Sequence, residues 1–508
     1  MKRIVICCDG TWNHLGMVSP TNVVKTVQAL KPISSEGIEQ LVYYDEGVGT
    51  QTGNWFSNVS EKVIGGAFGH GLEQNVQQAY RFIANNYNQG DDIFLFGFSR
   101  GAYTVRSVAG LIGCIGLLTR ANIIKTEAAY TLYKGKPSEQ QRAQFKSQYS
   151  TKEIKIKALC CWDTVGALGI PDKLPFIDFD KISKKKFRFI DDVIGSHIEN
   201  AFHALALHEQ RKEFTHTPML KHPNAPEQNV KQMWFSGDHS CIGGGSEHKK
   251  PLANIALNWM FDQVAELNLE LDKSIVAIDT IHPLWYLSYF NPSDAFIYGD
   301  GKRRVEATEN IHQTALQRFK DLSEKPLLHP VTAKHLFQKA ANVETQIHNK
   351  NVWKTLSPNE STIVLIHSNE YLNNGTYLKV ARSEQYQIET APQCQWQDKE
   401  LFCNADGWNL DIDNFADQIQ GLTGELKKQF IAMGRKSRIM KDENWFKLCV
   451  CDDKNPLEAH STAIGLSKQI NITHDHKLYA YANDAKLFVG DFYGNNKGWL
   501  PVKITRLC

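Results

Sequence analysis

The residues whose types and spacing best suit catalysis stand in the segment Gly97-Phe98-Ser99-Arg100-Gly101, which fits the pattern G-x-S-x-G. An apolar, strand-like run, Ile93–Gly97, leads into the motif, and a helical pattern continues over Ala102–Leu111. A strand-to-helix turn this tight strains the backbone of the serine, and the glycines remove side chains that would clash. The sequence therefore predicts that Ser99 is a nucleophile exposed at the head of a helix, where developing negative charge is favoured. The alternative is a structural glycine-rich turn with an incidental serine.

A serine in such a turn is inert without a base, and two later loops supply candidates. Asp163 directly follows the apolar run Ala158–Trp162, and His239 follows Gln232–Phe235 after a short loop. The order serine, acid, histidine is that of α/β-hydrolases, in which the carboxyl ends of parallel strands meet at one edge of the sheet. We therefore predict that His239 removes the Ser99 proton, and that Asp163 orients the imidazole and stabilises its charged form.

Other residues compete for these roles. The chain contains 18 histidines, and two of them, His203 and His208, fall in the segment His197–Glu213, which we interpret as a helix. Asp172 and Asp238 are rival acids, although Asp238 stands too near the candidate histidine to orient it from a separate loop. Position along the chain favours the pair named above.

An oxyanion hole would combine the backbone N–H of Arg100 with an N–H from another loop. If the strand order is 2-1-3, the first strand lies beside the strand that carries the serine, and the loop Asp9-Gly10-Thr11 supplies this donor through Gly10 or Thr11. Asp9 also suggests an aspartyl nucleophile of the haloacid-dehalogenase kind, but Thr11 stands where that chemistry needs a second aspartate. P-loop, HExxH and paired CxxC motifs do not occur, so Walker-type phosphoryl transfer and zinc hydrolysis have no support.

The elements that must position these residues alternate between strands and helices. Strands are predicted at Arg3–Cys8, Gln40–Tyr44, Ile93–Gly97, Ile156–Trp162 and Val230–Ser236, and helices at Asn22–Leu30, Gly71–Tyr87, Ala102–Leu111, Asn254–Leu271, Thr308–Leu322 and Val331–Ala341. This alternation predicts an α/β fold of the α/β-hydrolase type, with a mostly parallel sheet and helices on both faces. We assign residues 1–350 to this catalytic domain.

The pattern changes near residue 350, after which short β-rich runs are separated by Asn, Asp and Gly. These runs are Thr362–His367, Thr376–Ala381, Tyr386–Thr390, Phe446–Val450, Lys477–Tyr481 and Leu500–Thr505. We assign residues 351–508 to a C-terminal all-β sandwich domain that targets a surface, a glycan or a partner. Within it, Leu422–Met433 carries a helical pattern.

Composition excludes several classes of protein. The 508 residues include 57 Lys+Arg and 55 Asp+Glu, and a net charge of +2 gives no general attraction for nucleic acid. The longest near-apolar run, Ser107–Leu118, is too short to span a bilayer. The N-terminus starts a strand without room for a signal peptide, and an odd count of 11 cysteines, with adjacent pairs at Cys7-Cys8 and Cys160-Cys161, is typical of buried, reduced thiols. We therefore expect a chain that is made in the cytoplasm.

Six stretches follow one another in an order that a known family shares. They are Cys8-Asp9-Gly10-Thr11-Trp12-Asn13, Tyr44-Asp45-Glu46-Gly47-Val48-Gly49-Thr50, Gly90-Asp91 through Tyr103, Trp162-Asp163-Thr164-Val165-Gly166, His203-Ala204-Leu205-Ala206-Leu207, and Trp234-Phe235 through Gly243-Gly244-Gly245. Over roughly residues 1–290 the chain thus resembles a bacterial and fungal α/β-hydrolase domain family that includes the phospholipase effectors of type VI secretion systems.

The resemblance implies a Ser–His–Asp esterase acting on phospholipid acyl esters, as a phospholipase A does, with Ser99, Asp163 and His239 as its triad. It also implies a phospholipid membrane as the substrate surface, export by a type VI-like system, and a secretion-apparatus or immunity protein as partner. An antibacterial or anti-host effector role would follow.

Two positions depart from the family pattern. Cys241 stands where the family usually has Asp after His-Ser, and His208 stands where it has Asp after Ala-Leu-Ala-Leu. Neither is a triad member, so we expect activity to survive, while the carboxylate that would support His239 is in question. Asp9 and Cys241 are the candidate side chains behind the triad.

The last runs of the chain resemble the final strands of a galactose-binding lectin-like β-sandwich, whose members can hold calcium. Asp484, Asn495 and Asn496 offer the hard oxygen ligands that calcium prefers. A solvated hairpin loop explains the same residues equally well, since Asn, Asp and Gly form turns. Catalysis itself is expected to need no cofactor, so Ca²⁺ would belong to this domain alone.

These features predict a serine esterase or lipase with an appended β-sandwich. Two other functions remain open: a non-lipid esterase or thioesterase on the same fold, and a catalytically silent binding or interaction protein, against which the intact triad argues. The apolar segment Val108–Leu118, with Thr119–Ser150 after it, is either a lid or acyl-binding wall, or a core helix followed by a surface loop.

Overall fold

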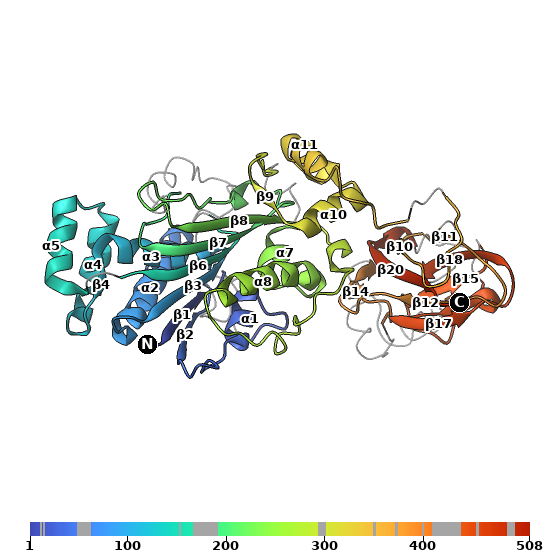
Figure 1. The fold of residues 1–508 in the computed structure, drawn as a ribbon, viewed down its shortest axis with the longest axis horizontal. Helices are drawn as coiled ribbons and strands as arrows, with labels where there is room; N and C mark the ends of the chain where they lie inside the picture. Colours follow the sequence, from blue (N-terminus) through green and yellow to red (C-terminus); the bar gives the residue numbers. More distant parts are fainter. Residues whose placement is uncertain are drawn as a thin grey trace. The chain divides into compact units, whose positions relative to one another are not determined.

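The structure is a computed structural model of the chain (Figure 1). It describes residues 1–10, 13, 16–47, 62–151, 154–165, 192–292, 301–348, 352–370, 374–398, 401–408, 438–453, 457–484 and 493–508. The chain divides into two compact units. The first comprises Met1–Ile281, Pro292–Leu316 and Glu324–Lys339, and the second comprises His282–Asn291, Gln317–Ser323 and Ala340–Cys508. Two short segments before residue 340 thus join the second unit, and the domain boundary at 350 stays a prediction.

The first unit is built on a seven-stranded sheet in the order β2-β1-β3-β6-β7-β8-β9. The strands are β1 (Arg3–Cys8), β2 (Gln40–Asp45), β3 (Asp92–Phe98), β6 (Ile156–Trp162), β7 (Ile198–Ala206), β8 (Asn229–Phe235) and β9 (Asn310–Ile311). Each strand runs parallel to its neighbours. Because β1 lies between β2 and β3, the condition set above for the oxyanion loop is met, and the loops after β1 and β3 leave the same edge side by side.

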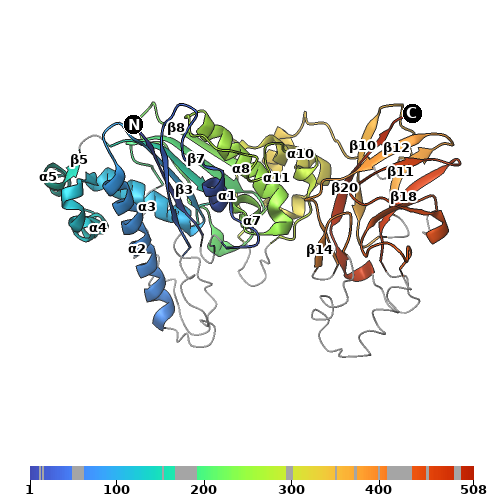
Figure 2. The same ribbon diagram turned by 90° about the horizontal axis from the view of Figure 1, so that it is seen from below.

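Helices cover both faces of this sheet. The helices of the described chain are α1 (Asn22–Ala29), α2 (Lys62–Asn86), α3 (Arg100–Ile115), α4 (Thr126–Lys134), α5 (Glu139–Tyr149), α7 (His239–Gly243), α8 (Lys250–Ala265), α10 (Gln313–Leu322) and α11 (Pro330–Lys339). Of these, α1, α2, α3, α7 and α8 contact strands of the sheet. Helices α2 and α3 lie against one face of the sheet (Figure 2). There, alternate residues of β1, Ile4 and Ile6, join an apolar cluster with Tyr80 of α2 and Val105 of α3. On the other face, α1 contacts β1 and β3, α8 contacts β7, and the two helices contact each other. The predicted α/β-hydrolase-like fold is confirmed.

One element of the sheet was predicted wrongly. The segment His197–Glu213 was expected to be a helix, but Ile198–Ala206 forms β7, paired with β6 and β8. Ala and Leu favour helices in isolation, whereas a strand buried on both faces reads as a continuous apolar run without alternation. Burial in the middle of the sheet outweighs local helix propensity here, since Ala201 through Ala206 are all buried.

The apolar segment after the serine motif belongs to the core. Val108, Leu111 and Ile112 lie on α3 and are almost fully buried in the same cluster as α2 and the strands, which agrees with the core interpretation of this segment. The chain after it forms α4 and α5, which contact α3, and the short strands β4 (Leu117–Leu118) and β5 (Ser150–Thr151) pair with each other. In the part of the chain that the structure describes, no helix is both long and apolar enough to cross a membrane.

The second unit contains two antiparallel four-stranded sheets, in the orders β10-β20-β12-β17 and β11-β18-β15-β16, and a small sheet β14-β13-β19. The strands are β10 (Ser361–His367), β11 (Gly375–Val380), β12 (Gln385–Glu389), β13 (Trp396–Asp398), β14 (Leu401–Cys403), β15 (Leu448–Cys451), β16 (Ser461–Ala463), β17 (Ser467–Asn471), β18 (His476–Ala482), β19 (Asn496–Lys497) and β20 (Trp499–Arg506). Strand β10 of the first sheet contacts β11 and β18 of the second, as in a β-sandwich. The predicted helical pattern at Leu422–Met433 lies outside the described residues.

Candidate active site

Ser99 occupies the sharp turn between β3 and α3 that the sequence predicted. Its backbone has φ 57° and ψ −119°, a conformation that is strained for a residue with a side chain. Gly97 and Gly101 make the turn possible, because a Cβ on Gly97 would stand 2.5 Å from the Gly101 carbonyl oxygen and a Cβ on Gly101 would stand 2.0 Å from the Cys8 carbonyl oxygen. Ser99 is only 6% exposed, so the expectation of an exposed serine is corrected. The loop after β1 contributes to this burial, because Gly10 lies against Ser99.

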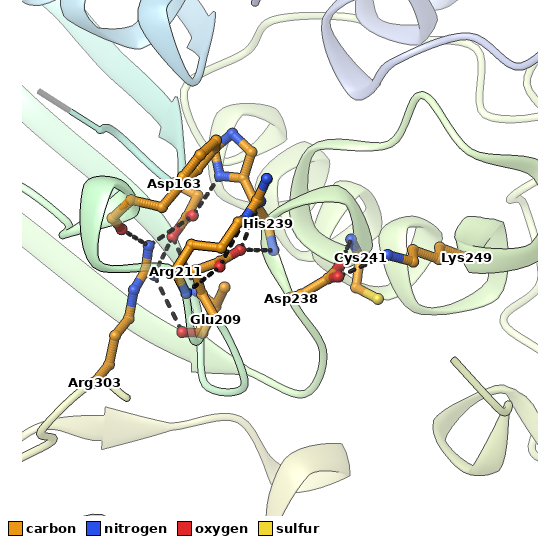
Figure 3. Close-up of polar contacts among 10 residues, drawn as sticks. Asp163, Glu209, Arg211, Asp238, His239, Cys241, Lys249 and Arg303 are labelled. Carbon is orange, nitrogen blue, oxygen red and sulfur yellow. Dashed lines mark hydrogen bonds and ion pairs between the residues drawn. The ribbon is translucent and has the colours of Figure 1, made fainter. Parts of the chain in front are cut away.

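Asp163 stands at the end of the neighbouring strand, β6, and is fully buried. The strands hold the two turns together, because the Ser99 N–H donates to the Trp162 carbonyl and the Asp163 N–H donates to the Ala204 carbonyl. The Asp163 carboxylate accepts hydrogen bonds from the Ala206 N–H at 3.1 Å and from Nδ1 of His239 at 2.6 Å (Figure 3). The predicted acid and histidine are therefore in direct contact.

A residue that the sequence did not single out, Arg303, completes this cluster. Its guanidinium contacts both oxygens of Asp163, with Nη1 at 2.5 Å from Oδ1 and Nη2 at 3.0 Å from Oδ2 (Figure 3). The same guanidinium donates to the carbonyls of Ala206 and Phe214, and the side chain is buried. Burial alone would raise the pKa of Asp163, but the charge of Arg303 and the contact with His239 hold this pKa well below its usual range. Asp163 is thus held as a carboxylate.

His239 opens the short helix α7, and its surroundings fix the ring. The rings of Phe98 and Phe214 lie against the imidazole, with centroids 4.6 Å and 4.9 Å away. The His239 backbone N–H donates to Oε2 of buried Glu209, and the Arg211 guanidinium pairs with the same carboxylate (Figure 3). Sequence reasoning missed Glu209, which holds the backbone of the histidine and not its ring.

The two departures from the family pattern lie behind this loop. Nδ1 of His208 accepts the Gly237 N–H at 2.8 Å, so His208 positions the loop that leads to the histidine. The Cys241 N–H donates to Asp238, which caps α7 and also pairs with buried Lys249 at 2.6 Å. Burial raises the pKa of the Cys241 thiol, so it stays protonated. Cys241 therefore supports the turn of α7.

The predicted oxyanion loop lies where the strand order puts it. A Cβ on Gly10 would stand 3.2 Å from Cβ of Ser99, so the loop after β1 adjoins the serine. The Gly10 N–H itself donates to Oδ1 of Asp9 at 2.7 Å, while Arg100 is the first residue of α3. Thr11 lies outside the described residues. To stabilise an oxyanion, the Gly10 N–H would have to give up its hydrogen bond to Asp9.

Asp9 organises this loop. Its carboxylate accepts hydrogen bonds from the hydroxyls of Thr21 at 2.6 Å and Tyr44 at 3.1 Å, and Thr21 also caps α1. Burial raises the pKa of Asp9 to about 6, although these hydrogen bonds oppose the shift. Asp9 is thus placed behind the loop and beside the serine turn, as the sequence suggested.

The rival residues are used elsewhere or lie outside the described chain. Nε2 of buried His203 accepts the Thr164 N–H at 3.1 Å, and burial lowers the pKa of this histidine to about 3. Asp238 pairs with Lys249, and Asp172 lies outside the described residues. Among the described candidates, the contact with His239 belongs to Asp163.

In the second unit, the structure brings two of the three predicted calcium ligands together. The amide NH₂ of Asn496 donates to Oδ2 of Asp484 at 2.9 Å, and both side chains are buried. Asn496 thus turns a donor toward the carboxylate, whereas a shared calcium ion would need an oxygen from each residue. The side chain of Asn495 is outside the described atoms, and calcium binding stays a prediction.

The fold and the serine turn define the class: a parallel sheet with helices on both faces and a strained serine between β3 and α3 is an α/β-hydrolase fold. Residues 2–263 match the family model described as "T6SS, Phospholipase effector Tle1-like, catalytic domain". The chain belongs to this family of phospholipase effector domains, and so to the hydrolases.

Other similarities are more distant. The uncharacterized protein YEL023C of Saccharomyces cerevisiae is 29% identical over 188 residues, which are 33% of this chain and 27% of that protein. An uncharacterized protein from Pseudomonas aeruginosa has a solved structure with a TM-score of 0.32 and 17% identity, covering 57% of this chain and 51% of its own. The Tle1 effector solved bound to the VgrG spike has a TM-score of 0.27 and 19% identity, covering 48% and 51% of the two chains.

Proposed function

We propose that the chain is a serine esterase that hydrolyses acyl esters of phospholipids, in the manner of a phospholipase A. The observation that carries this proposal is the contact of His239 with buried, ionised Asp163 at the sheet edge where the strained turn holds Ser99. Membership of a phospholipase effector family supports a lipid substrate.

In the proposed reaction, His239 takes the proton of Ser99 as the serine oxygen attacks the ester carbonyl. The tetrahedral intermediate collapses to an acyl-serine, and the imidazolium protonates the departing lysophospholipid alcohol. Water, deprotonated by the same imidazole, then releases the fatty acid and restores the serine. The Asp163 contact to Nδ1 keeps Nε2 as the nitrogen that accepts the proton, so no metal or cofactor is needed for these steps.

Negative charge on the tetrahedral oxygen needs donors at the serine turn. Arg100 opens α3 directly after Ser99, and its backbone N–H together with the positive end of the helix dipole suits this role. The loop of Gly10 and Thr11 is the nearest source of a second donor, because Gly10 packs against the serine. We include both residues in the proposed oxyanion site.

We further propose an effector role with export by a type VI-like system. The family to which the chain belongs consists of phospholipase effectors of type VI secretion systems. A phospholipid membrane would be the substrate surface, and a secretion-apparatus or immunity protein the partner. The second unit, with its β-sandwich sheets, would then serve as a targeting module for a surface or a glycan.

The test combines an active-site probe with a lipid assay. Ser99→Ala should abolish labelling by a fluorophosphonate and release of fatty acid from phospholipid vesicles, with the far-UV spectrum unchanged. Ser236→Ala is the matched control, because the Ser236 hydroxyl is buried close to the same sheet edge with no hydrogen-bond partner among the described residues. Undiminished labelling of the Ser99→Ala protein would contradict the proposed nucleophile.

A further inference from the structure

A cluster of imidazole rings and one carboxylate lies in the second unit, apart from any residue used above. One ring nitrogen of His474, one of His476 and a carboxylate oxygen of Asp452 all lie within 4.8 Å of one another. Nε2 of His474 stands 2.7 Å from Oδ2 of Asp452. A fourth residue, His460, places Nδ1 3.2 Å from the other oxygen, Oδ1. We propose that this cluster is a binding site for Zn²⁺ or a similar borderline transition-metal cation.

The hydrogen bonds of the rings favour this role. Nδ1 of His476 stands 3.1 Å from the Lys477 carbonyl oxygen, which requires a proton on Nδ1 and leaves the lone pair of the neutral ring on Nε2. Nδ1 of His474 contacts the Thr473 hydroxyl at 3.0 Å, so Nε2, which faces Asp452, is its remaining nitrogen. Metal-binding histidines are typically held in this way by an oxygen partner on the second nitrogen.

The donor set selects the kind of cation. Two imidazoles and a carboxylate are ligands of zinc and its neighbours, with water completing a tetrahedral shell, whereas calcium and magnesium prefer oxygen alone. Ligand atoms around a tetrahedral zinc stand roughly 3.3 Å apart, given bonds of about 2.0–2.1 Å. The ligand atoms now lie within 4.8 Å of one another, and rotations of the exposed His474 and half-exposed His476 side chains would bring them to this shorter separation. His460 would hold the carboxylate in place through Oδ1.

A thiol beside the cluster does not join it. Cys451 directly precedes Asp452, but its sulfur contacts the Asp453 carbonyl at 3.0 Å and its side chain packs in the apolar cluster of the sandwich. The site is therefore built from nitrogen and oxygen.

The positions of the ligands along the chain determine how a bound metal would affect the stability of the second unit. Asp452 follows β15, His474 stands in the turn between β17 and β18, and His476 is the first residue of β18. Strand β17 belongs to one four-stranded sheet, while β15 and β18 belong to the other. A bound cation would thus tie the end of β15 to the turn between β17 and β18, and raise the stability of the second unit, since it binds the folded state.

The experiment titrates Zn²⁺ into the metal-free full-length protein by calorimetry and follows the melting temperature with and without the metal. One Zn²⁺ per chain should bind, and Co²⁺ substitution should give the visible absorption of a tetrahedral site. Asp452→Asn and His474→Ala should each weaken binding by at least about tenfold and remove the metal-dependent rise in melting temperature. Lysophospholipid production should not change in either variant.

Asp475→Asn is the matched control, because Asp475 stands between His474 and His476 in the same turn but accepts the Arg382 N–H instead of facing Asp452. Its Zn²⁺ affinity should equal that of the unmodified protein. The proposal would be overturned if the unmodified protein did not bind Zn²⁺. It would also be overturned if all variants bound Zn²⁺ with equal affinity, because the metal would then bind elsewhere. Both outcomes are independent of whether Ser99 is the nucleophile.

Discussion

Each unit of the molecule contains an aspartate between two or more nitrogen donors, and the two aspartates differ in their access to water. Asp163 is 0% exposed and is enclosed by His239, Arg303 and a backbone N–H. The Asp452 side chain is 14% exposed, and it is held by His460 and His474, whose side chains are 50% and 59% exposed. A buried carboxylate must be paired to persist as an anion, whereas one with exposed partners can exchange them for water or a cation.

The difference explains why the two clusters suit different chemistry. Around Asp163, fixed partners leave His239 one orientation, which is what a general base requires. Around Asp452, the imidazole partners are largely exposed and can turn toward a metal, and no arginine competes for the carboxylate among its described contacts. Similar residue types therefore predict a preorganised catalytic pair in one unit and an adaptable ligand site in the other.

The largest expected effect comes from neutralising the buried aspartate. Asp163→Asn should lower kcat for ester hydrolysis by about 10⁴-fold, because an amide no longer selects the His239 tautomer or stabilises the imidazolium. Asp452→Asn, the same change in the exposed cluster, should leave kcat unaltered. Steady-state rates on a soluble short-chain ester measure both. A loss below tenfold in Asp163→Asn would remove Asp163 from the proposed triad.

The sequence predicted most of the framework that places these residues. Central strands such as Arg3–Cys8 and Ile156–Trp162 were predicted to the residue, because strands buried on both faces are continuous apolar runs bounded by turns. The strand order was only a condition for the proposed oxyanion loop, and the pairing of β1 with β2 and β3 meets it. β7 was missed because its Ala and Leu residues carry no strand periodicity and its burial depends on partners distant in sequence.

The candidate site was predictable only as far as local motifs reach. Ser99, Asp163 and His239 each follow a recognisable strand, so position along the chain identified them. Arg303 lies 140 residues from Asp163 in a segment without a motif, and only the folded chain brings them together. The orientation of the Gly10 N–H toward Asp9 is likewise a local geometry that no spacing pattern encodes.

Arg303 provides the next test of the comparison between Asp163 and Asp452, since no arginine is among the described contacts of Asp452. Arg303→Met should lower the free energy of unfolding by roughly 3–5 kcal/mol, because it leaves Asp163 buried with less compensation. Among molecules that remain folded, kcat should fall by about 10–100-fold with little change in KM, since a misplaced Asp163 disturbs the base rather than substrate binding.

Arg304→Met is the matched control for this change. The neighbouring Arg304 is exposed and pairs with Glu306 at the surface, so its loss should alter neither stability nor kcat measurably. Arg303→Lys should recover part of the stability, because it keeps the charge and loses the two-pronged contact. Equal effects of Arg303→Met and Arg304→Met would show that the guanidinium does not position the carboxylate.

A smaller effect is expected on the pH dependence of stability. The pKa of Asp163 is lowered on folding, so its stabilisation is fully present above the unfolded value of about 3.9 and is lost as pH falls below it. The difference in unfolding free energy between the native protein and Asp163→Asn should therefore be constant near neutral pH and shrink below pH of about 4. Urea denaturation from pH 7 to 3.5 measures this difference in unfolding free energy. A difference that increased as the pH fell would contradict the lowered pKa.

The smallest effect concerns Asp452, the aspartate with exposed partners, in the absence of metal. With a chelator present, Asp452→Asn should lower the free energy of unfolding by less than about 1 kcal/mol, because ion pairs with exposed partners contribute little in water. The same substitution at Asp163 strands the buried Arg303 guanidinium without its counter-charge and should cost several times more, roughly 3–5 kcal/mol. Denaturation curves of the two variants in matched buffer give the ratio directly. Comparable losses at both positions would mean that the ion pairs of Asp452 stabilise the protein as much as those of Asp163. The histidine rings around Asp452 would then be held too firmly to turn toward a cation.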